Sequence, residues 1–451
     1  MKSFFTAARV AMPGLFAGVC VAALGANGAL AGSYGLHEQS AEALGESFAG
    51  VAAGAGGLSA MFWNPATLTN NAGMQSSSSL SLLIPYSAPT FTGTNIFGVG
   101  AGLPALTTGS NQFVAPVALP ASYSSYQVND KLWLGLAVNT PFGLSTKNPL
   151  GSSAELWGLT TTVFTTDINP QIAYKINDWI SVGAGLQIEY METRQTAALA
   201  PIANPPVAQL KGSSWGVGFN LGVTVKPIDG TEIGIGYRSQ VREGLKGNLT
   251  GVIAPGPVAL PAIPVSAPLT LPDSINVGLR QRISPQFTLL AGLEWTDWSK
   301  EQSLVVSSNG GGIVPAGAVI QTLAFNYRDG WMFSLGGEYK LDQRWTLRAG
   351  VAYEQSPVTN ANRNVTLLDS DRYWLSLGAS YQYNEKLKFD ISYAHVIYAS
   401  GTISIPASAA TALFPANPIT YNANSAARGD VVSIGFTYRF DTPVAAVVAK
   451  Y

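Results

Sequence analysis

Long stretches of this chain alternate apolar and polar or small residues with a period of two. In "RWTLRAGVAY", tryptophan, leucine, alanine, valine and tyrosine share one face, opposite threonine, arginine and glycine. "DWISVGAGLQIEY" and "VVSIGFTYRF" repeat the scheme. Such alternation is typical of β-strands with two unlike faces. No stretch after residue 31 has the roughly 18 uninterrupted apolar residues that a spanning helix requires, so the pattern predicts an all-β protein.

The connections between the predicted strands alternate between short polar turns, such as "VNDK" and "KLDQR", and much longer loops. An even number of strands with short turns at one rim and long loops at the other is typical of an outer-membrane barrel. Because lipid offers no hydrogen-bond partners, a spanning sheet has to close on itself. We therefore expect a transmembrane antiparallel β-barrel of about 14 strands over residues 74–440. The expected strands lie near 74–84, 113–128, 131–145, 155–176, 178–195, 211–227, 231–250, 270–283, 286–306, 327–341, 344–358, 370–384, 386–404 and 428–440.

The composition excludes several kinds of partner. Hydrophobic residues make up 47% of the chain and charged residues 11%, well below the roughly 25% charged residues of a soluble domain. With a formal net charge of −1, the chain has no electrostatic basis for binding nucleic acid or an anionic membrane surface. Composition alone would also suit a helical membrane protein or a poorly soluble repeat, so the strand period decides the fold class.

The first residues, 1–31, have the features of a secretory signal peptide. Lys2 and Arg9 precede an apolar stretch, and a small-residue cleavage signature ends at Ala31. The alternative is a transmembrane anchor, which the proline and scattered glycines of the stretch disfavour. The only cysteine, Cys20, lies within this segment, so the mature chain would have neither disulfide bonds nor a thiolate metal site.

Residues 32–73 stand between the expected cleavage site and the first strand. They contain the small-residue run "GVAAGAGGLSA" and then "AMFWNPATLT", in which Pro65 fixes a turn and Asn64 can cap backbone groups. A barrel of this size encloses a lumen too wide for wall side chains to fill. We therefore predict that the segment folds into the lumen from the periplasmic side. The alternative is a disordered periplasmic leader.

The long loops are unexpectedly apolar. "TAALAPIANPPVAQL" (196–210) and "GVIAPGPVALPAIPVSAPL" (251–269) are the clearest cases, and "GGIVPAGAVI" (311–320) and "ATALFPANPI" (410–419) are similar. Contiguous exposed apolar surface usually marks a binding site, and the prolines hinder aggregation through strand pairing. The alternative is that the loops pack on one another and cap the barrel without a ligand.

Several motifs resemble the long-chain fatty acid transport (FadL) family of outer-membrane proteins. The likeness covers nearly the whole mature chain, and the family includes a branch of barrels for aromatic hydrocarbons such as toluene and xylene. The motifs are "AGSYGLHEQSAEALGESFAG" at the mature start, "NPA" at 64–66, "LPDSINVGLRQRISPQFTLLAGLEWTDWS" (271–299), "DGWMFSLGGEYKLDQRWTLRAGVAYEQSPV" (329–358) and "DSDRYWLSLGASYQYNEKLKFDISYAHV" (369–396).

The resemblance implies that residues 32–73 form a hatch that plugs the lumen. It also implies an external ligand groove between the loops after strands five and seven, which correspond to 196–210 and 251–269. From this groove the ligand would move to an inner pocket against the hatch. The expected groove residues are Leu199, Ile202, Val207, Leu210, Val252, Ile253, Val258 and Leu260.

The resemblance further implies a sideways exit through the wall. The gap would lie where the third strand kinks inward, within 131–176, and Gly151 and Gly158 are candidates for the bend. The motif at 64–66 is expected to touch this kink, so that hatch and gap move together. The expected gating residues are Asn64, Pro65 and Ala66.

A fatty acid carboxylate would need a cation or several hydrogen-bond donors. The resemblance places Arg328 near the bound head group, and Arg194 is a weaker match to a second basic position. Both could instead be rim residues that face lipopolysaccharide or solvent. Fatty acids, alkanes and monoaromatic hydrocarbons suit the same barrel, so the expected function is uptake of hydrophobic compounds, with long-chain fatty acids as the first choice.

An outer-membrane enzyme such as a phospholipase is the contrasting hypothesis. It would need a nucleophile and a base, and the only histidines, His37 and His395, do not form a serine–histidine set. We expect no enzyme activity, cofactor or metal. The expected partners are the hydrophobic ligand, outer-membrane lipid and lipopolysaccharide, without nucleic acid, for a monomer in the outer membrane of a Gram-negative bacterium. Residues 441–451 are expected to form a C-terminal tail.

Overall fold

The structure is a computed structural model that describes residues 33–87, 90–91, 116–148, 154–198, 207–253, 258–311, 314–406, 421–425 and 427–441. The expected signal peptide and residues 442–451 of the expected tail lie outside the described residues. Of the apolar loops, all of 410–419 and the centre of 196–210 also lie outside them.

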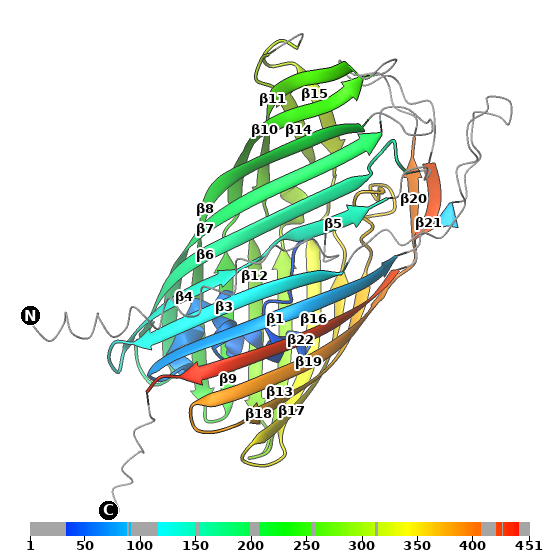
Figure 1. The fold of residues 1–451 in the computed structure, drawn as a ribbon. Coiled ribbons are helices and arrows are strands. Elements are labelled where there is room, and N and C mark those ends of the chain that lie inside the picture. Colours follow the sequence, from blue (N-terminus) through cyan, green and yellow to red (C-terminus); the bar gives the residue numbers. More distant parts are fainter. Residues whose placement is uncertain are drawn as a thin grey trace, which may run out of the picture.

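Fourteen wall strands pair antiparallel around a closed barrel (Figure 1). The elements are β1 (Met74–Ser87), β3 (Val117–Gln127), β4 (Leu132–Asn139), β5 (Gly143–Lys147), β6 (Thr160–Lys175), β7 (Ile180–Ala198), β8 (Val207–Ile228), β9 (Thr231–Arg238), β10 (Val241–Ile253), β11 (Val258–Leu271), β12 (Ser274–Arg282), β13 (Phe287–Thr296), β14 (Ser303–Ser308), β15 (Val319–Ala324), β16 (Gly330–Lys340), β17 (Trp345–Gln355), β18 (Arg372–Gln382), β19 (Leu387–Tyr398) and β22 (Ala427–Arg439). The pairs β4 and β5, β9 and β10, β11 and β12, β13 and β14, and β15 and β16 each form one interrupted wall strand. β1 closes the ring by pairing with β22 and with β3. The expected antiparallel barrel is confirmed.

Alternation along each strand separates the outside of the barrel from its lumen. In β17, Leu347 and Val351 are exposed on the outer face, whereas Arg348 and Ala352 are buried on the inner face. The same order holds in β8, where Val217 and its apolar neighbours point outward. The outer face is thus apolar and the inner face polar or small, as expected for a wall that lipid surrounds.

The prediction of a loop at 251–269 is wrong. β10 continues to Ile253, and β11 pairs with it from Val258 onward. The prolines concealed the strand, but they occupy positions where a strand tolerates them. The Pro264 carbonyl accepts a hydrogen bond from Asn309 on the edge away from β10, so the missing N–H faces the same edge. That edge pairs with β14 at only two positions, so no ladder bond is lost there.

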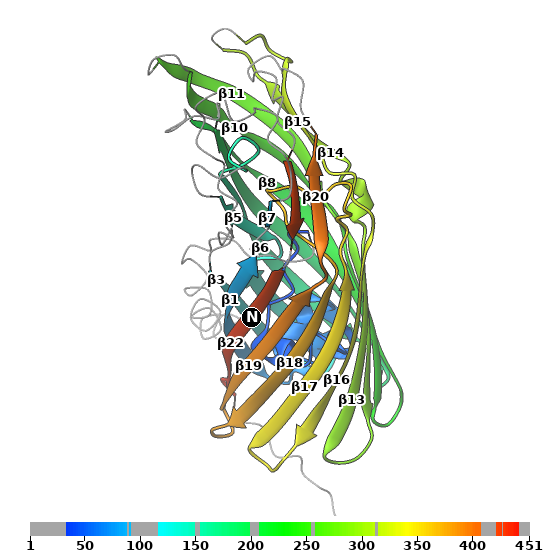
Figure 2. The ribbon, with the colours of Figure 1, turned by 90° about the vertical axis from the view of Figure 1, so that its right-hand side faces the viewer.

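Residues 33–73, which we call the luminal segment, lie inside the barrel (Figures 1 and 2). The segment contains the short helices α2 (Ala41–Leu44), η2 (Val51–Ala53), η3 (Gly57–Phe62) and η4 (Pro65–Asn70). These helices contact strands from around the ring: α2 contacts β18, β19 and β22, η2 contacts β9 and β12, and η4 contacts β6, β7 and β8. The segment therefore occupies the lumen across its width.

Glycines on the inner face of the wall allow the luminal segment to lie directly against it. A Cβ atom added at Gly222 of β8 would overlap the side chain of Asn64, and one added at Gly234 of β9 would overlap the carbonyl oxygen of Ala52. Any larger residue at these positions would push the segment away from the wall.

A buried ionic cluster holds α2 to the opposite side of the wall. Arg348 of β17 lies 2.6 Å from the carboxylate of Glu42 and 2.8 Å from that of Glu46. Lys388 of β19 lies 2.5 Å from the second oxygen of Glu42. Because these charges are buried, removal of Arg348 would leave Glu46 without a cation.

The remaining elements lie at the rim with the long loops. β2 (Thr90–Phe91), β20 (Gly401–Ile405) and β21 (Tyr421–Ser425) form a small separate sheet. The helix η5 (Trp298–Lys300) interrupts the wall strand between β13 and β14. Within the described ranges, no helix is long and apolar enough to cross a membrane.

Candidate functional site

An apolar cavity, which we call the outer cavity, lies in the half of the barrel toward the long loops and has about 900 Å³ of empty space, part of it open to solvent. Lys211 and Lys246 also border it, but they alternate along their strands with the inward-facing Leu210 and Leu245, so their ammonium groups point away from the lumen. Lys211 pairs outside with Glu192, 3.0 Å away. The apolar lining comprises Leu144, Val163, Met191, Leu210, Leu245, Val265, Ala267, Leu269, Leu304, Val306, Leu323 and Phe325.

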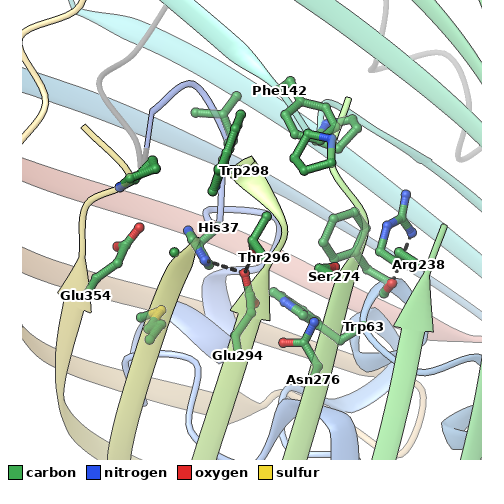
Figure 3. Close-up of a pocket in the computed structure, with 18 of the residues that line it drawn as sticks. His37, Trp63, Phe142, Arg238, Ser274, Asn276, Glu294, Thr296, Trp298 and Glu354 are labelled. Atoms are coloured by element: carbon green, nitrogen blue, oxygen red, sulfur yellow. Dashed lines mark hydrogen bonds and ion pairs between the residues drawn. The ribbon is translucent and has the colours of Figure 1, made fainter. Parts of the chain in front are cut away.

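A second cavity, the inner cavity, lies against the luminal segment (Figure 3) and has about 800 Å³ of empty space, part of it open to solvent. His37, Phe62 and Trp63 of the luminal segment form part of its lining. Its lining includes five ionisable residues, among them three carboxylates: His37, Glu189, Arg238, Glu294 and Glu354. A ligand in this cavity would contact both apolar rings and polar groups.

Most of these charges are already paired. Arg238 binds Asp167 at 2.7 Å and lies over the ring of Phe62, 4.4 Å from its centroid. The imidazole Nε2 of His37 lies 3.0 Å from Glu294. Burial opposes the protonation of His37, but the carboxylates of Glu294 and Glu354 outweigh it and raise the pKa of His37 to about 9. The imidazole is therefore held in its charged form.

Four aromatic side chains separate the two cavities. Tyr34 and Tyr327 line the outer cavity, whereas Phe142 and Trp298 line the inner one. The ring of Trp298 lies 5.0 Å from that of Tyr34 and 6.1 Å from that of Phe142, edge to face in both cases. The Tyr34 hydroxyl donates to Glu301. These rings pack in contact, so passage between the cavities requires them to move.

The wall is broken beside the inner cavity. β4 pairs with β6 as far as Asn139, and pairing resumes at Gly143 with the register shifted by one residue. β3 pairs with β4 only over Ser122–Gln127, and no pairing among the described residues joins Val117–Ala121 to β5. Pro141 and Phe142, between β4 and β5, line the inner cavity. The third wall strand thus leaves its neighbour at the height of the cavity.

The start of the luminal segment occupies this break. The Leu36 amide donates to the Pro141 carbonyl at 2.8 Å, and the Gly143 amide donates to the Tyr34 carbonyl at 2.7 Å. The side chain of Gln39 donates to the Thr140 carbonyl at 2.7 Å. These bonds satisfy the backbone groups that the interrupted strand leaves unpaired.

The expectation that the 64–66 motif touches the kink is wrong. Asn64 lies against β8 and not at the break: its amide donates to Val223 of β8 at 2.9 Å and to Ala52 at 2.6 Å. Its side-chain oxygen accepts from Ala66 and thereby caps η4, with Pro65 as the first helical residue. The motif fixes the position of the luminal segment, whereas residues 34–39 contact the break.

Some of the expected groove residues belong to strands, and others lie outside the described residues. Leu210 lines the outer cavity, and Val207 begins β8. Leu199 and Ile202 lie outside the described residues. The backbones of Val252, Ile253, Val258 and Leu260 belong to the β10–β11 hairpin instead of a loop. Their role as ligand contacts stays a prediction.

The two expected head-group arginines do not border either cavity. Arg194 lies on the outer face of β7 and binds Gln209 at 2.8 Å. Arg328, 45% exposed, lies 3.3 Å from Asp371 and donates to the Ser356 carbonyl. A role for either in binding carboxylates stays a prediction.

The expected bend residues do not mark the break. Gly151 lies outside the described residues, and Gly158 precedes β6, away from positions 140–142. The signal that could have located the break is "NTPF", a proline within an alternating run. Of the two histidines, His395 faces outward and binds Asp430 at 2.8 Å, whereas His37 belongs to the inner cavity.

Comparisons with known proteins agree with this architecture. Residues 22–440 match the model of the family described as outer membrane protein transport protein (OMPP1/FadL/TodX). A relative from Salmonella typhi, a long-chain fatty acid transport protein, is 28% identical over 398 residues, which cover 80% of this chain and 86% of the relative. The crystal structure of a Pseudomonas aeruginosa FadL homologue covers 91% of this chain and all of its own, with a TM-score of 0.79 and 23% identity. That of the Ralstonia pickettii toluene transporter TbuX covers 91% of this chain and 99% of its own, with a TM-score of 0.66 and 19% identity.

Proposed function

This chain belongs to the outer membrane protein transport family (OMPP1/FadL/TodX), and from that premise we propose that it takes up long-chain fatty acids through the outer and inner cavities and releases them sideways. It is an outer-membrane transport protein and not an enzyme. The fatty acid transporter among its relatives supports the substrate class. The observation that carries the route is the meeting of the inner cavity and the wall break at Phe142.

Two successive cavities suit the transport of an apolar chain. Each buried methylene group contributes about 0.8 kcal/mol, so full burial of a sixteen-carbon chain would contribute roughly 10 kcal/mol. A single enclosing site would release such a ligand slowly. In the proposal, the outer cavity binds the alkyl chain first. The chain reaches the inner cavity when the aromatic rings between the cavities move apart: Tyr34, Phe142, Trp298 and Tyr327.

The sideways exit follows from the unpaired edge of the wall. In the proposal, residues 34–39 of the luminal segment withdraw from the break, and the ligand passes between β3 and β5 into the lipid. The ligand then leaves without crossing an aqueous channel. The hydrogen bonds of Leu36 and Gly143 across the break support this coupling, because they join the movable segment to the interrupted strand.

The same proposal covers the contacts of the barrel with the membrane and its oligomeric state. The exposed apolar band, with Trp215, Val217 and Leu377 among its most exposed members, would contact outer-membrane lipid, and the rim toward the long loops would contact lipopolysaccharide. One chain closes the ring by itself, which supports a monomer.

A second candidate substrate is a monoaromatic hydrocarbon or an alkane. None of the described residues directs a cation into the outer cavity. The segments 92–115, 149–153, 199–206, 254–257 and 407–420 contain no lysine, arginine or histidine in the sequence, so they supply none either. This neutral lining favours ligands without a charged head group.

Uptake assays on cells without a transporter of their own test the proposal. Leu245→Trp would fill the outer cavity and should reduce oleate uptake at least about tenfold, because it removes the volume that holds the alkyl chain. Val217→Trp, on the outer face of β8, is the matched control. Undiminished oleate uptake by Leu245→Trp would contradict the route. Toluene uptake without oleate uptake would favour the second candidate, and reduced oleate binding by Arg328→Ala would establish that arginine as a head-group contact.

A further inference from the structure

Three cations lie on the outer face of neighbouring wall strands, toward the long loops (Figure 1). They are Arg194 of β7, Lys211 of β8 and Lys246 of β10, and we call them the basic patch. Arg194 is directly opposite Lys211 in the β7–β8 ladder, and Lys246 is the diagonal neighbour of Lys211 in the β8–β10 ladder. This register places the backbone of each cation within about 8 Å of the next. Like charges in such positions destabilise a sheet unless an anion compensates them.

The protein itself compensates only part of this charge. Glu192 of β7 pairs with Lys211 at 3.0 Å. Arg194 donates to the neutral amide of Gln209 at 2.8 Å, and neither Arg194 nor Lys246 has an ion pair among the described residues. Three cations less one carboxylate leave an excess of two positive charges. Because the net charge of the whole chain is only −1, this excess is a local feature of the wall.

Two other cations on the side of the long loops have carboxylate partners within the chain. Lys300 lies 2.5 Å from Asp273 and 2.9 Å from Asp297. Arg328 lies 3.3 Å from Asp371. The basic patch differs from these sites in its uncompensated charge, which indicates an anion supplied from outside the chain.

The basic patch lies beyond an aromatic pair at the edge of the exposed apolar band. Tyr190 of β7 and Trp215 of β8 are directly opposite each other, and their ring centroids are 5.2 Å apart. Arg194 and Lys211 each lie four residues from these rings, on the side of the long loops. Aromatic girdles mark the two interfaces of a membrane barrel, and the long loops are extracellular. The patch is therefore at the level of the polar head groups of the outer leaflet, which lipopolysaccharide forms.

We infer that Arg194, Lys211 and Lys246 bind a phosphate group of lipid A, the phosphorylated glycolipid part of lipopolysaccharide, on the membrane side of the wall. This inference rests on the part of the proposed function that places lipopolysaccharide at this rim, and it does not depend on the transport route. A guanidinium group binds phosphate oxygens in a bidentate way, and the ammonium groups beside it add positive charge. A phosphate monoester carries a charge of about −1.5 to −2 at pH 7, which matches the excess charge of the patch.

Lipid binding to the delipidated full-length protein, measured by native mass spectrometry, tests the inference. The three lipids are lipid A with both phosphates, the same lipid A without phosphates, and phosphatidylglycerol. The wild-type protein should bind phosphorylated lipid A at least about tenfold more tightly than the dephosphorylated form, because several cations near a membrane surface each contribute to binding an anionic head group. It should also bind phosphorylated lipid A more tightly than phosphatidylglycerol, and added salt should weaken the binding.

The double variant Arg194→Gln/Lys246→Gln removes the two cations that have no ion pair and keeps the pair of Lys211 with Glu192. It should bind phosphorylated lipid A at least about tenfold more weakly than the wild type, with unchanged affinity for the dephosphorylated form. The charge-conserving variant Arg194→Lys/Lys246→Arg should retain the binding, which a loss of folding would not allow.

A matched control removes the same amount of charge at the opposite rim. Lys340 and Arg344 are exposed beside the short turn between β16 and β17. The variant Lys340→Gln/Arg344→Gln should bind all three lipids as the wild type does.

Three results would overturn the inference: equal binding of phosphorylated lipid A by the wild type and Arg194→Gln/Lys246→Gln, equal binding of lipid A with and without phosphates, or tighter binding of phosphatidylglycerol than of phosphorylated lipid A. Each of them leaves the transport route standing, since oleate uptake tests that route separately. Failure of the wild type to bind lipid A in either form would overturn the proposed lipopolysaccharide contact and this inference with it.

Discussion

The backbone amide of Leu36 donates to the carbonyl of Pro141 over 2.8 Å, so the luminal segment completes the wall strand at the point where it is broken. The reciprocal bond from Gly143 to Tyr34 makes the contact resemble a short stretch of sheet. Because the closure uses backbone groups, it does not depend on the size of the side chains involved. Withdrawal of the segment would expose the inner cavity to the break.

The glycine contacts give a first prediction. Gly222→Ala should destabilise the docked luminal segment by about 1–3 kcal/mol, because the new methyl group overlaps Asn64. Limited proteolysis of residues 33–73 and the thermal unfolding midpoint measure the effect. Gly244→Ala is the matched control, since its Cβ atom would meet nothing within 4 Å. Equal behaviour of the two variants would contradict this packing.

The ionic cluster gives a second prediction. Arg348→Ala leaves Glu46 buried without its cation and Glu42 with Lys388 alone, and the docked segment should lose about 3 kcal/mol of stability. Hydrogen exchange of residues 41–47 should accelerate while the wall strands stay protected. Arg344→Ala, at an exposed turn, should have no such effect. Unchanged exchange in Arg348→Ala would show that the cluster does not hold the segment.

The cap of η4 gives a third prediction. Asn64→Ala removes the bonds to Val223 and Ala52 and the cap on Ala66, at a cost of about 1–2 kcal/mol or more. Deletion of residues 64–66 should abolish uptake, although the barrel should still assemble and shift its mobility on heating in gel electrophoresis. Normal uptake by the deletion variant would exclude a role of the motif in positioning the segment.

The charge of His37 gives a fourth prediction. Its folded pKa of about 9 lies above the unfolded value of about 6.5. The pair with Glu294 therefore stabilises the protein fully below about pH 6.5 and loses its contribution as the pH rises through about 9. The thermal unfolding midpoint should fall between pH 7 and pH 10 in the wild type, and less steeply in His37→Gln. Parallel pH profiles would contradict the pairing.

Local pattern was sufficient to predict the wall, because each strand shows its two faces in its own residues. Trp345 and Leu347 are exposed and Arg348 is buried, as the period of two requires. The strand at Val258–Leu271 is not apparent from the sequence because its prolines resemble those of a loop, and they are acceptable because the neighbouring edge pairs with β14 at only two positions.

The site depends on contacts that no local pattern contains. Leu36 and Pro141 are far apart in the sequence, and no residue pattern in either segment predicts the hydrogen bond between them. The docking of the 64–66 motif against Gly222 is equally non-local, so its position was predicted wrongly even though its turn and cap were apparent. Glu189 likewise comes to line the inner cavity only when β7 is paired with β6 and β8.

A reversible cross-link tests whether residues 34–39 must leave the break for transport. Gly35 and Phe142 are directly opposite bridge partners, a spacing that suits a disulfide, and the only native cysteine, Cys20, lies in the expected signal peptide. Ser47 and Ser376, whose hydroxyls lie 2.7 Å apart, provide a control pair that ties the segment to β18 far from the break.

The measurement is oleate uptake by each double-cysteine variant, oxidised and then reduced. We expect that oxidised Gly35→Cys/Phe142→Cys transports no oleate and recovers on reduction, whereas oxidised Ser47→Cys/Ser376→Cys transports normally. Uptake at the wild-type rate by the oxidised Gly35→Cys/Phe142→Cys protein would contradict it.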